Sequence, residues 1–89
     1  MHPIEILGSR SRLRLLHELS RGDRYVSQLM EAVRLDGKNC KYHLDILEKA
    51  GIVASREEGR RKYYSLKKEI LLYISPSPDR RYEVQFTDV

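Results

Sequence analysis

Apolar residues recur at helical spacing in the first third of the chain. They are Leu13, Leu15, Leu16 and Leu19. A recurrence near 3.6 residues predicts a helix with one face on a core. Ser9 is placed to cap the start of this helix, because a serine hydroxyl accepts a hydrogen bond from an amide of the first turn, and Gly22 is placed to end it. A short apolar opening, made of Ile4, Ile6 and Leu7, precedes the helix.

Two further helices are predicted between residues 26 and 50. The first covers residues 26–33, with apolar residues at i, i+3, i+4 and i+7, namely Val26, Leu29, Met30 and Val33. The second covers residues 37–50, with Asp36 as its N-cap and Gly51 after its end. Its predicted buried stripe consists of Cys40, His43 or Leu44, Leu47 and Ala50. About three residues join the two helices, which is the spacing of a helix-turn-helix.

Beyond Gly51 the period of the pattern changes from about 3.6 to about 2. Residues 52–56 and 61–66 are predicted to form two strands, joined across residues 57–60, where Gly59 can take a positive φ. A helix-turn-helix followed by a hairpin is a winged helix. The predicted fold class is therefore α+β, a winged helix-turn-helix with a three-helix core and a β-hairpin wing.

The C-terminal residues are predicted to form extra strands. Residues 70–74 are an apolar run rich in strand formers, and the segment Ser75-Pro76-Ser77-Pro78 stops it. Tyr82, Val84 and Phe86 then alternate with polar residues. A short helix over residues 67–73 is the competing interpretation. The expected division is a winged helix-turn-helix domain over residues 1–66 and a C-terminal strand extension over residues 67–89.

The composition narrows the possible classes of protein. The chain has 89 residues, enough for a single core, and a formal net charge of +4. A small excess of positive charge is compatible with a nucleic-acid partner but also common without one. The single cysteine, Cys40, excludes an internal disulfide and predicts a reducing compartment. No apolar run is long enough to span a membrane, and the N-terminus does not resemble a signal peptide, so a cytoplasmic location is expected.

No catalytic pattern stands out in the sequence. It contains no glycine-rich phosphate loop, no paired carboxylates on a pocket-forming element and no nucleophile with an evident base. One small core also leaves little room for a substrate cavity. The chain is therefore predicted not to be an enzyme and to need no cofactor.

Three segments together resemble the ArsR-like winged-helix regulators. They are LGSRSRLRLLHELSRGD, the His-Leu-x-x-Leu-x-x-Ala-Gly pattern at residues 43–51 and the Gly-Arg-Arg-x-Tyr-Tyr pattern at residues 59–64. The resemblance covers residues 6–66. It implies that the helix at residues 37–50 enters the major groove of DNA and that the wing lies on the neighbouring backbone or minor groove. Metal-sensing members carry a Cys-x-Cys pair on the helix equivalent to residues 26–33, which here reads VSQLMEAV, so metal sensing is not implied.

The resemblance assigns two groups of residues to DNA. On the helix, Lys38, Asn39, Lys41 and Tyr42 are expected to face DNA, and in the wing, Arg60, Arg61 and Lys62 are expected to touch phosphates. The chemistry agrees, because lysine can donate to guanine and asparagine can bond adenine through two atoms. The alternative for the helix is an ordinary solvated face. Gly37 either lets the backbone approach a phosphate or is a simple corner residue.

Several other residues have competing interpretations. Glu57 and Glu58 precede the basic wing tip, so either they pair with its arginines or only one side of the tip faces DNA, and the second is preferred. A solvated face with pairs such as Arg14 and Glu18 is preferred over phosphate contacts for the first-helix arginines, Arg10, Arg12 and Arg14. Cys40 and His43 have a spacing that could hold metal, but a structural role is preferred, ahead of a redox switch at Cys40.

The leading function is a sequence-specific regulator that binds double-stranded DNA as a homodimer. The alternatives are a protein- or RNA-interaction module and an architectural DNA binder without sequence preference. The expected dimer surface joins the apolar opening to the terminal strands, which hold more apolar residues than a hairpin and one helix easily cover. No membrane partner is expected, and the sequence identifies no effector, no operator and no direction of regulation.

Overall fold

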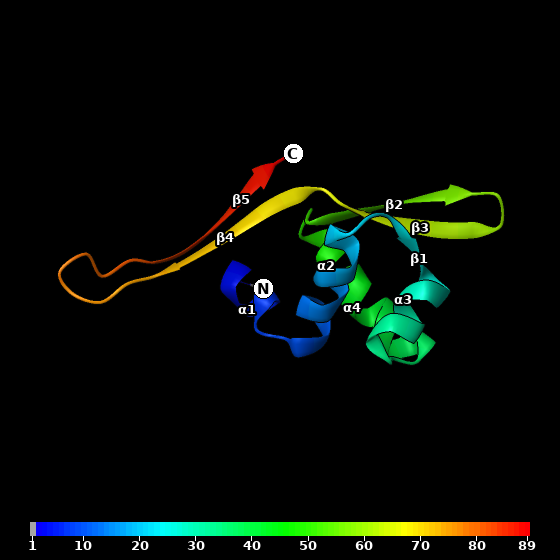
Figure 1. Ribbon diagram of the computed structural model, residues 1–89, viewed down its shortest axis with the longest axis horizontal. Helices are drawn as coiled ribbons and strands as arrows, with labels where there is room; N and C mark the ends of the chain where they lie inside the picture. Colours follow the sequence, from blue (N-terminus) through cyan, green and yellow to red (C-terminus); the bar gives the residue numbers. More distant parts are fainter. Residues whose placement is uncertain (1) are drawn as a thin grey trace.

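The computed structural model describes residues 2–89 and shows a helical body with two hairpins that extend in opposite directions (Figure 1). The elements, in chain order, are α1 (Pro3–Leu7), α2 (Arg10–Ser20), β1 (Arg24–Tyr25), α3 (Val26–Val33), α4 (Gly37–Lys49), β2 (Val53–Glu58), β3 (Arg61–Leu66), β4 (Lys68–Ile74) and β5 (Tyr82–Asp88). Strands β1, β3 and β2 form one antiparallel sheet, and β4 and β5 form another. The predicted α+β winged-helix fold is confirmed.

The predicted helix caps are confirmed. The Ser9 hydroxyl accepts from the backbone N–H of Arg12 at 3.2 Å, which starts α2. One carboxylate oxygen of Asp36 accepts from the backbone N–H of Asn39 at 2.8 Å, which starts α4. Each bond satisfies an amide that has no partner within its helix. Gly51 follows α4 with a φ of +76°, a conformation that glycine adopts without strain.

The core lies where α2, α3 and α4 meet the first sheet. Leu15, Leu29, Leu44 and Leu47 are fully buried there, together with Ile52 at the start of the wing. The predicted stripe on α4 is confirmed for Cys40, Leu44 and Leu47, whereas His43 and Ala50 are half-buried. Leu13 belongs to the predicted apolar pattern of α2 but is 49% exposed.

Three local features differ from the prediction. The apolar opening forms a short helix, α1, with Ile6 buried against the core. Strand β2 continues through Glu57 and Glu58, so the wing turn consists of residues 59–60 instead of 57–60. Gly59 takes a φ of +65° in this turn, as expected. Strand β1 was not predicted, because its two residues are too few to show a period.

The C-terminal strands form a separate hairpin. Ile70, Leu72 and Ile74 on β4 lie opposite Phe86, Val84 and Tyr82 on β5. This pairing rules out the competing helix over residues 67–73. Among the described residues, no helix is both long enough and apolar enough to cross a bilayer.

Candidate nucleic-acid interface

The first two turns of α4 present polar side chains on the side opposite the core. Lys38, Asn39, Lys41 and Tyr42 are all exposed, and Tyr42 is 58% exposed although it is aromatic. Cys40 and Leu44 of the same helix point into the core. Helical periodicity therefore separates a structural face from a face that is free to contact a ligand.

Asn39 is engaged in the cap of α4. Its side-chain amide donates to Asp36 Oδ2 at 2.9 Å, while its backbone N–H donates to Asp36 Oδ1. Reading adenine through two atoms uses both the amide nitrogen and the amide oxygen of asparagine. Asn39 must therefore leave the carboxylate of Asp36 before it can read a base in this way. Lys38, Lys41 and Tyr42 have no hydrogen bond of this kind to release within the described residues.

The three basic residues of the wing have different surroundings. Arg60 is fully on the surface at the turn, whereas the Arg61 guanidinium stacks 4.3 Å from the ring centroid of Tyr25. Lys62 Nζ lies 5.5 Å from the ring centroid of Tyr64. Tyr64 raises the pKa of Lys62, and Glu48 and Asp45 on α4 add to the effect. Lys62 is half-buried and directed toward the body, whereas Arg60 and Arg61 are exposed.

The two wing glutamates lie on opposite faces of the ribbon. Glu58 is paired with Arg56 of its own strand at 3.2 Å, and Arg56 also contacts Asp23 at 2.7 Å. Glu57 lies across from Lys62 in the ladder. Because neighbouring strand residues point to opposite faces, each face carries one acid. That only one side of the tip faces DNA, the preferred interpretation, stays a prediction; Glu58 pairs with an arginine, though not with one at the tip.

A shallow cavity of about 270 Å³ lies between α3 and the wing. Tyr25, Ser27, Arg60 and Arg61 contribute to its lining. The positive end of the α3 dipole and two guanidinium groups therefore meet in one place, an arrangement that attracts an anion. The sequence pattern did not identify Tyr25 or Ser27, since neither belongs to a basic motif.

Arg12 is the largest correction to the sequence-based interpretation. It was expected on a solvated face, but it is only 7% exposed. Its Nε donates to the carbonyl of Ile6 at 2.7 Å, its Nη2 donates to the carbonyl of Glu5 at 3.2 Å, and its Nη1 donates to Nδ1 of His43 at 3.0 Å. Arg12 therefore connects α1 and α4 and is not available to phosphates. The sequence contains one signal of this burial: Arg12 lies three residues before Leu15 and four before Leu16, which places it on the buried face of the helix.

The other α2 pairing also differs from the prediction. Glu18 lies 3.9 Å from Arg21, at the end of the helix, instead of pairing with Arg14. Both partners are accessible to solvent, so this pair contributes little to stability.

Cys40 and His43 have surroundings that favour a structural role. Burial, followed by the nearby charge of Asp36, raises the pKa of the Cys40 thiol. Burial, followed by the charge of Arg12, lowers the pKa of His43. A buried thiol of raised pKa is a poor nucleophile and a poor ligand. No group of three or more potential metal ligands occurs among residues 2–89.

Gly37 offers a test of its two interpretations. A Cβ at this position meets only Met30, at 3.7 Å, which is ordinary contact. Gly37→Ala is therefore expected to leave the fold intact and to raise the free energy of unfolding by about 0.4–1 kcal/mol, because alanine reduces the entropy of the unfolded chain. Denaturant unfolding measures this change. DNA titration of the same variant then separates the roles: weaker binding indicates a close phosphate, and unchanged binding indicates a corner residue.

The comparisons agree with this geometry. Residues 9–55, more than half of the chain, match the sequence family described as bacterial regulatory protein, arsR family. A curated relative, the uncharacterized HTH-type transcriptional regulator Rv0081 of Mycobacterium tuberculosis, is 37% identical over 57 residues, which is 63% of this chain and 50% of the relative. The chain thus aligns with half the length of the curated relatives it matches.

Solved structures of related proteins have the same fold. The crystal structure of M. tuberculosis Rv0081 aligns with a TM-score of 0.69 at 34% identity, covering 71% of this chain and 64% of the other. The homodimeric winged helix-turn-helix DNA-binding domain of Mb0332 from Mycobacterium bovis, described as a possible ArsR-family transcriptional regulator, aligns with a TM-score of 0.66 at 31% identity, covering 70% and 57%. With its winged helix-turn-helix and its matching sequence, this chain belongs to the arsR family of bacterial regulatory proteins.

Proposed function

We propose that this chain is a transcription regulator that binds specific sequences of double-stranded DNA as a homodimer. Residues 37–50 enter the major groove, and residues 57–62 of the wing follow the backbone. The observation that carries this proposal is the division of α4 into a buried apolar stripe and an exposed face with Lys38, Lys41 and Tyr42. The family assignment supports the same function. The proposed partner is double-stranded DNA in the cytoplasm, and the proposed role is that of a regulator and not of an enzyme.

The proposed contacts divide into two kinds. The first turns of α4 read base edges, with Lys41 and Tyr42 free to do so and Asn39 available after it leaves Asp36. Arg60 and Arg61 hold the phosphate backbone, together with the amide groups at the start of α3. Lys62 contributes less, because it is half-buried over Tyr64 whereas Arg61 is exposed.

The reason to propose a homodimer is that sequence-specific DNA binding generally needs two copies of such a domain. One winged helix contacts only a few base pairs, so selective binding in a genome generally needs two copies on two half-sites about 34 Å apart. The homodimeric state described for the Mb0332 domain is consistent with this arrangement.

Selection from a random duplex pool tests the function, with two matched variants to test the roles. The unmodified chain is expected to enrich a two-fold symmetric motif. Lys41→Ala is expected to cost about 1–3 kcal/mol on that motif and to relax the preference at one position in each half-site, since the lysine reads a base edge. Arg61→Ala is expected to weaken binding to all sequences by similar factors, since it contacts phosphate. Binding constants on the motif and on a scrambled duplex measure both effects.

Other outcomes favour the alternatives. A pool that stays flat while DNA is bound indicates an architectural protein, and no retention of any duplex indicates a protein- or RNA-interaction module. A Lys41→Ala variant with an unchanged motif and affinity would show that α4 is not the reading element.

A further inference from the structure

In the β4–β5 hairpin, every isoleucine, leucine, valine and phenylalanine except Leu71 lies on one face. Cross-strand partners share a face, so the pairs alternate between the two sides of the ribbon. We call the apolar side the inner hairpin face; it consists of Ile70, Leu72, Ile74, Tyr82, Val84 and Phe86. The outer hairpin face carries mostly polar residues, namely Glu69, Leu71, Tyr73, Glu83, Gln85 and Thr87.

Within residues 2–89, only the base of the inner hairpin face is covered. Ile70 and Phe86 pack against the core, and α1 contacts β5. Farther out, Leu72 is 51% exposed, Ile74 is 68% exposed and Tyr82 is 67% exposed. A two-stranded hairpin on its own is marginally stable in water. The outer half of this face therefore lacks the cover that stabilises its base.

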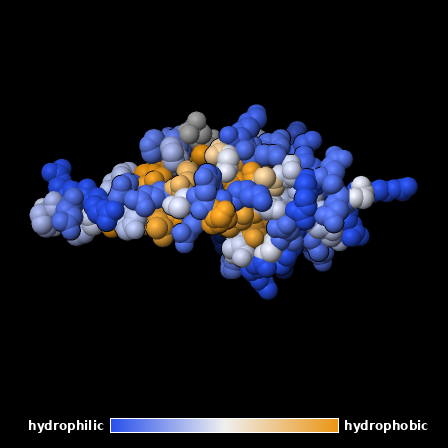
Figure 2. Space-filling model, turned by 90° about the horizontal axis from the view of Figure 1, so that it is seen from above, coloured by the Kyte–Doolittle hydropathy of each residue, from blue (hydrophilic) through white to orange (hydrophobic). Residues whose placement is uncertain are grey.

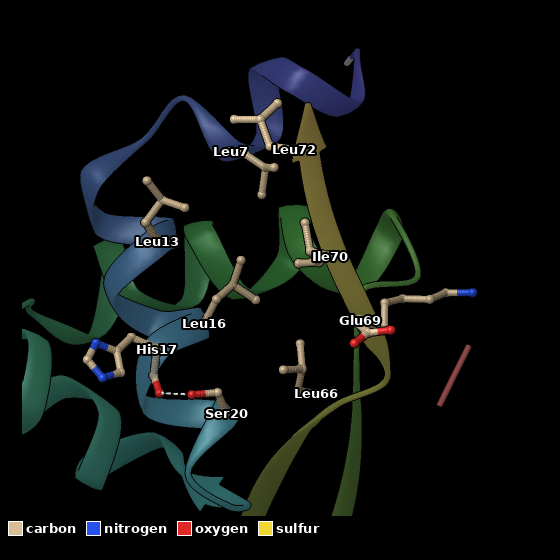
Figure 3. A pocket seen from close by; sticks show the side chains of 10 residues that line it. Leu7, Leu13, Leu16, His17, Ser20, Leu66, Glu69, Ile70 and Leu72 are labelled. Carbon is tan, nitrogen blue, oxygen red and sulfur yellow. Dashed lines mark hydrogen bonds between the residues drawn. The ribbon is translucent and has the colours of Figure 1, made fainter. Parts of the chain in front are cut away.

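A groove of about 520 Å³ opens beside the same face, between α1, α2 and β4 (Figure 3). Leu7, Leu13 and Leu16 line it from the helices, and Leu66, Ile70 and Leu72 line it from the strands. Figure 2 shows apolar side chains gathered between the helical body and the base of the hairpin, with hydrophilic surface over the hairpin tip and the wing. The groove and the uncovered face thus form one continuous apolar surface.

We propose that a second copy of this chain covers this surface, with the outer half of each inner hairpin face lying in the partner's groove beside α1 and α2. This inference rests on the proposed function, because it names the interface of the proposed homodimer. The contact of Ile70 and Phe86 with the body shows, within one chain, that the face packs against this helical surface. Because both complementary surfaces lie side by side on the same chain, one two-fold rotation covers both of them at once.

The direction of the hairpin fits a dimer that holds DNA. The β4–β5 hairpin and the wing extend from opposite ends of the body (Figure 1). A dimer joined through the hairpin therefore leaves α4 and the wing free. DNA is a poor occupant of the inner hairpin face, since the six residues of this face include no cation and the neighbouring Lys68 is paired with Asp88 at the base. The hairpin also lies outside residues 9–55, so the family match does not assign this interface.

Three single substitutions at exposed positions test the interface in the full chain. Ile74→Lys places a charge on the inner face, Leu13→Lys places one in the groove, and Leu71→Lys places one on the outer face at a residue that is 40% exposed. Sedimentation equilibrium measures the dimer dissociation constant of each. We expect increases of about 30-fold or more for the first two, as for central interface residues, and less than about 3-fold for Leu71→Lys. Circular dichroism checks that each variant is folded.

A cross-linking experiment tests the reciprocal arrangement. Cys40→Ser removes the native thiol, and Leu13→Cys and Ile74→Cys are then made on separate chains. Mixing the two chains with a short bismaleimide is expected to yield the mixed dimer, whereas Leu13→Cys mixed with Leu71→Cys is expected to yield little. A predominant link between two copies of Ile74→Cys would mean that the hairpins stack on each other and would overturn the proposed arrangement.

The results separate this interface from the DNA-binding function. A monomer at all concentrations, or a dimer that Ile74→Lys and Leu13→Lys leave intact, overturns the interface even if DNA is bound. A dimer that both variants dissociate, but that binds no duplex, keeps the interface and overturns the function. If both proposals hold, monomeric Ile74→Lys binds a single half-site weakly and no longer distinguishes the palindrome.

Discussion

Binding of this chain to duplex DNA is expected to weaken by about 10³- to 10⁵-fold as the salt concentration rises from about 50 to about 200 mM. The reason is the release of counterions from phosphates that the protein neutralises. A dimer with the cationic groups of α4 and the wing on both half-sites neutralises about 6–10 phosphates, so the logarithm of the binding constant falls against the logarithm of salt with a slope of about −5 to −9. Fluorescence anisotropy titrations on a labelled duplex at several salt concentrations measure this slope.

Two arginine variants make the salt experiment specific to the proposed surface. Arg61→Ala removes a cation beside the start of α3 and is expected to reduce the magnitude of the slope by about one for each protomer. Arg81→Ala removes a cation that pairs with Glu83 on the second hairpin, far from the wing (Figure 1), and is expected to leave the slope unchanged. A slope near zero for the unmodified chain would contradict DNA binding itself, and equal slopes for both variants would contradict the role of the wing.

Arg12→Ala is expected to lower the free energy of unfolding by about 3 kcal/mol or more. The guanidinium is nearly buried and donates to two backbone carbonyls and to His43, and hydrogen bonds that involve a charged group contribute about 1.5–3 kcal/mol each. Alanine leaves those acceptors without their donor and leaves a space between α1 and α4. Such a loss is a large fraction of the total stability of a small domain. Urea unfolding at fixed pH and protein concentration measures it.

Two controls separate the geometry of Arg12 from its charge. Arg14→Ala, on the exposed side of the same helix, is expected to change stability by less than about 0.5 kcal/mol. Arg12→Lys keeps the charge but has a single ammonium that does not reproduce the planar fork, so it is expected to recover only part of the loss. Equal unfolding midpoints for Arg12→Ala and Arg14→Ala would show that the buried contacts of Arg12 do not stabilise the fold.

Local patterns predicted most of the winged helix. The helix boundaries follow from caps that act over three residues, such as Ser9 with Arg12 and Asp36 with Asn39, and from apolar periods that lie within one element. The hairpin strands follow from alternation and from the need for a positive φ at Gly59. These features depend on residues close together in the chain, so they can be recognised before the tertiary contacts are known.

The candidate DNA-reading face was also visible in the sequence, but the state of its side chains was not. The period of α4 separates Lys38, Lys41 and Tyr42 from Cys40 and the other buried residues. The contacts of Lys62 with Tyr64 and of Arg61 with Tyr25 involve strand register and a short third strand, β1. Sequence spacing contains no information on which of two neighbouring cations stacks on which ring.

Long-range packing decided the remaining features. The charge of Arg12 favours a solvated position. Its burial is nevertheless favourable, because α1 and His43 together supply three hydrogen-bond acceptors. The C-terminal strands were recognisable from alternation, whereas the covered base and uncovered outer half of their apolar face depend on how far the hairpin extends beyond α1 and α2. Local residue preferences thus determined which elements form, and the three-dimensional arrangement of those elements determined which side chains are buried, paired or left free for a partner, because burial depends on neighbours that are distant in the chain.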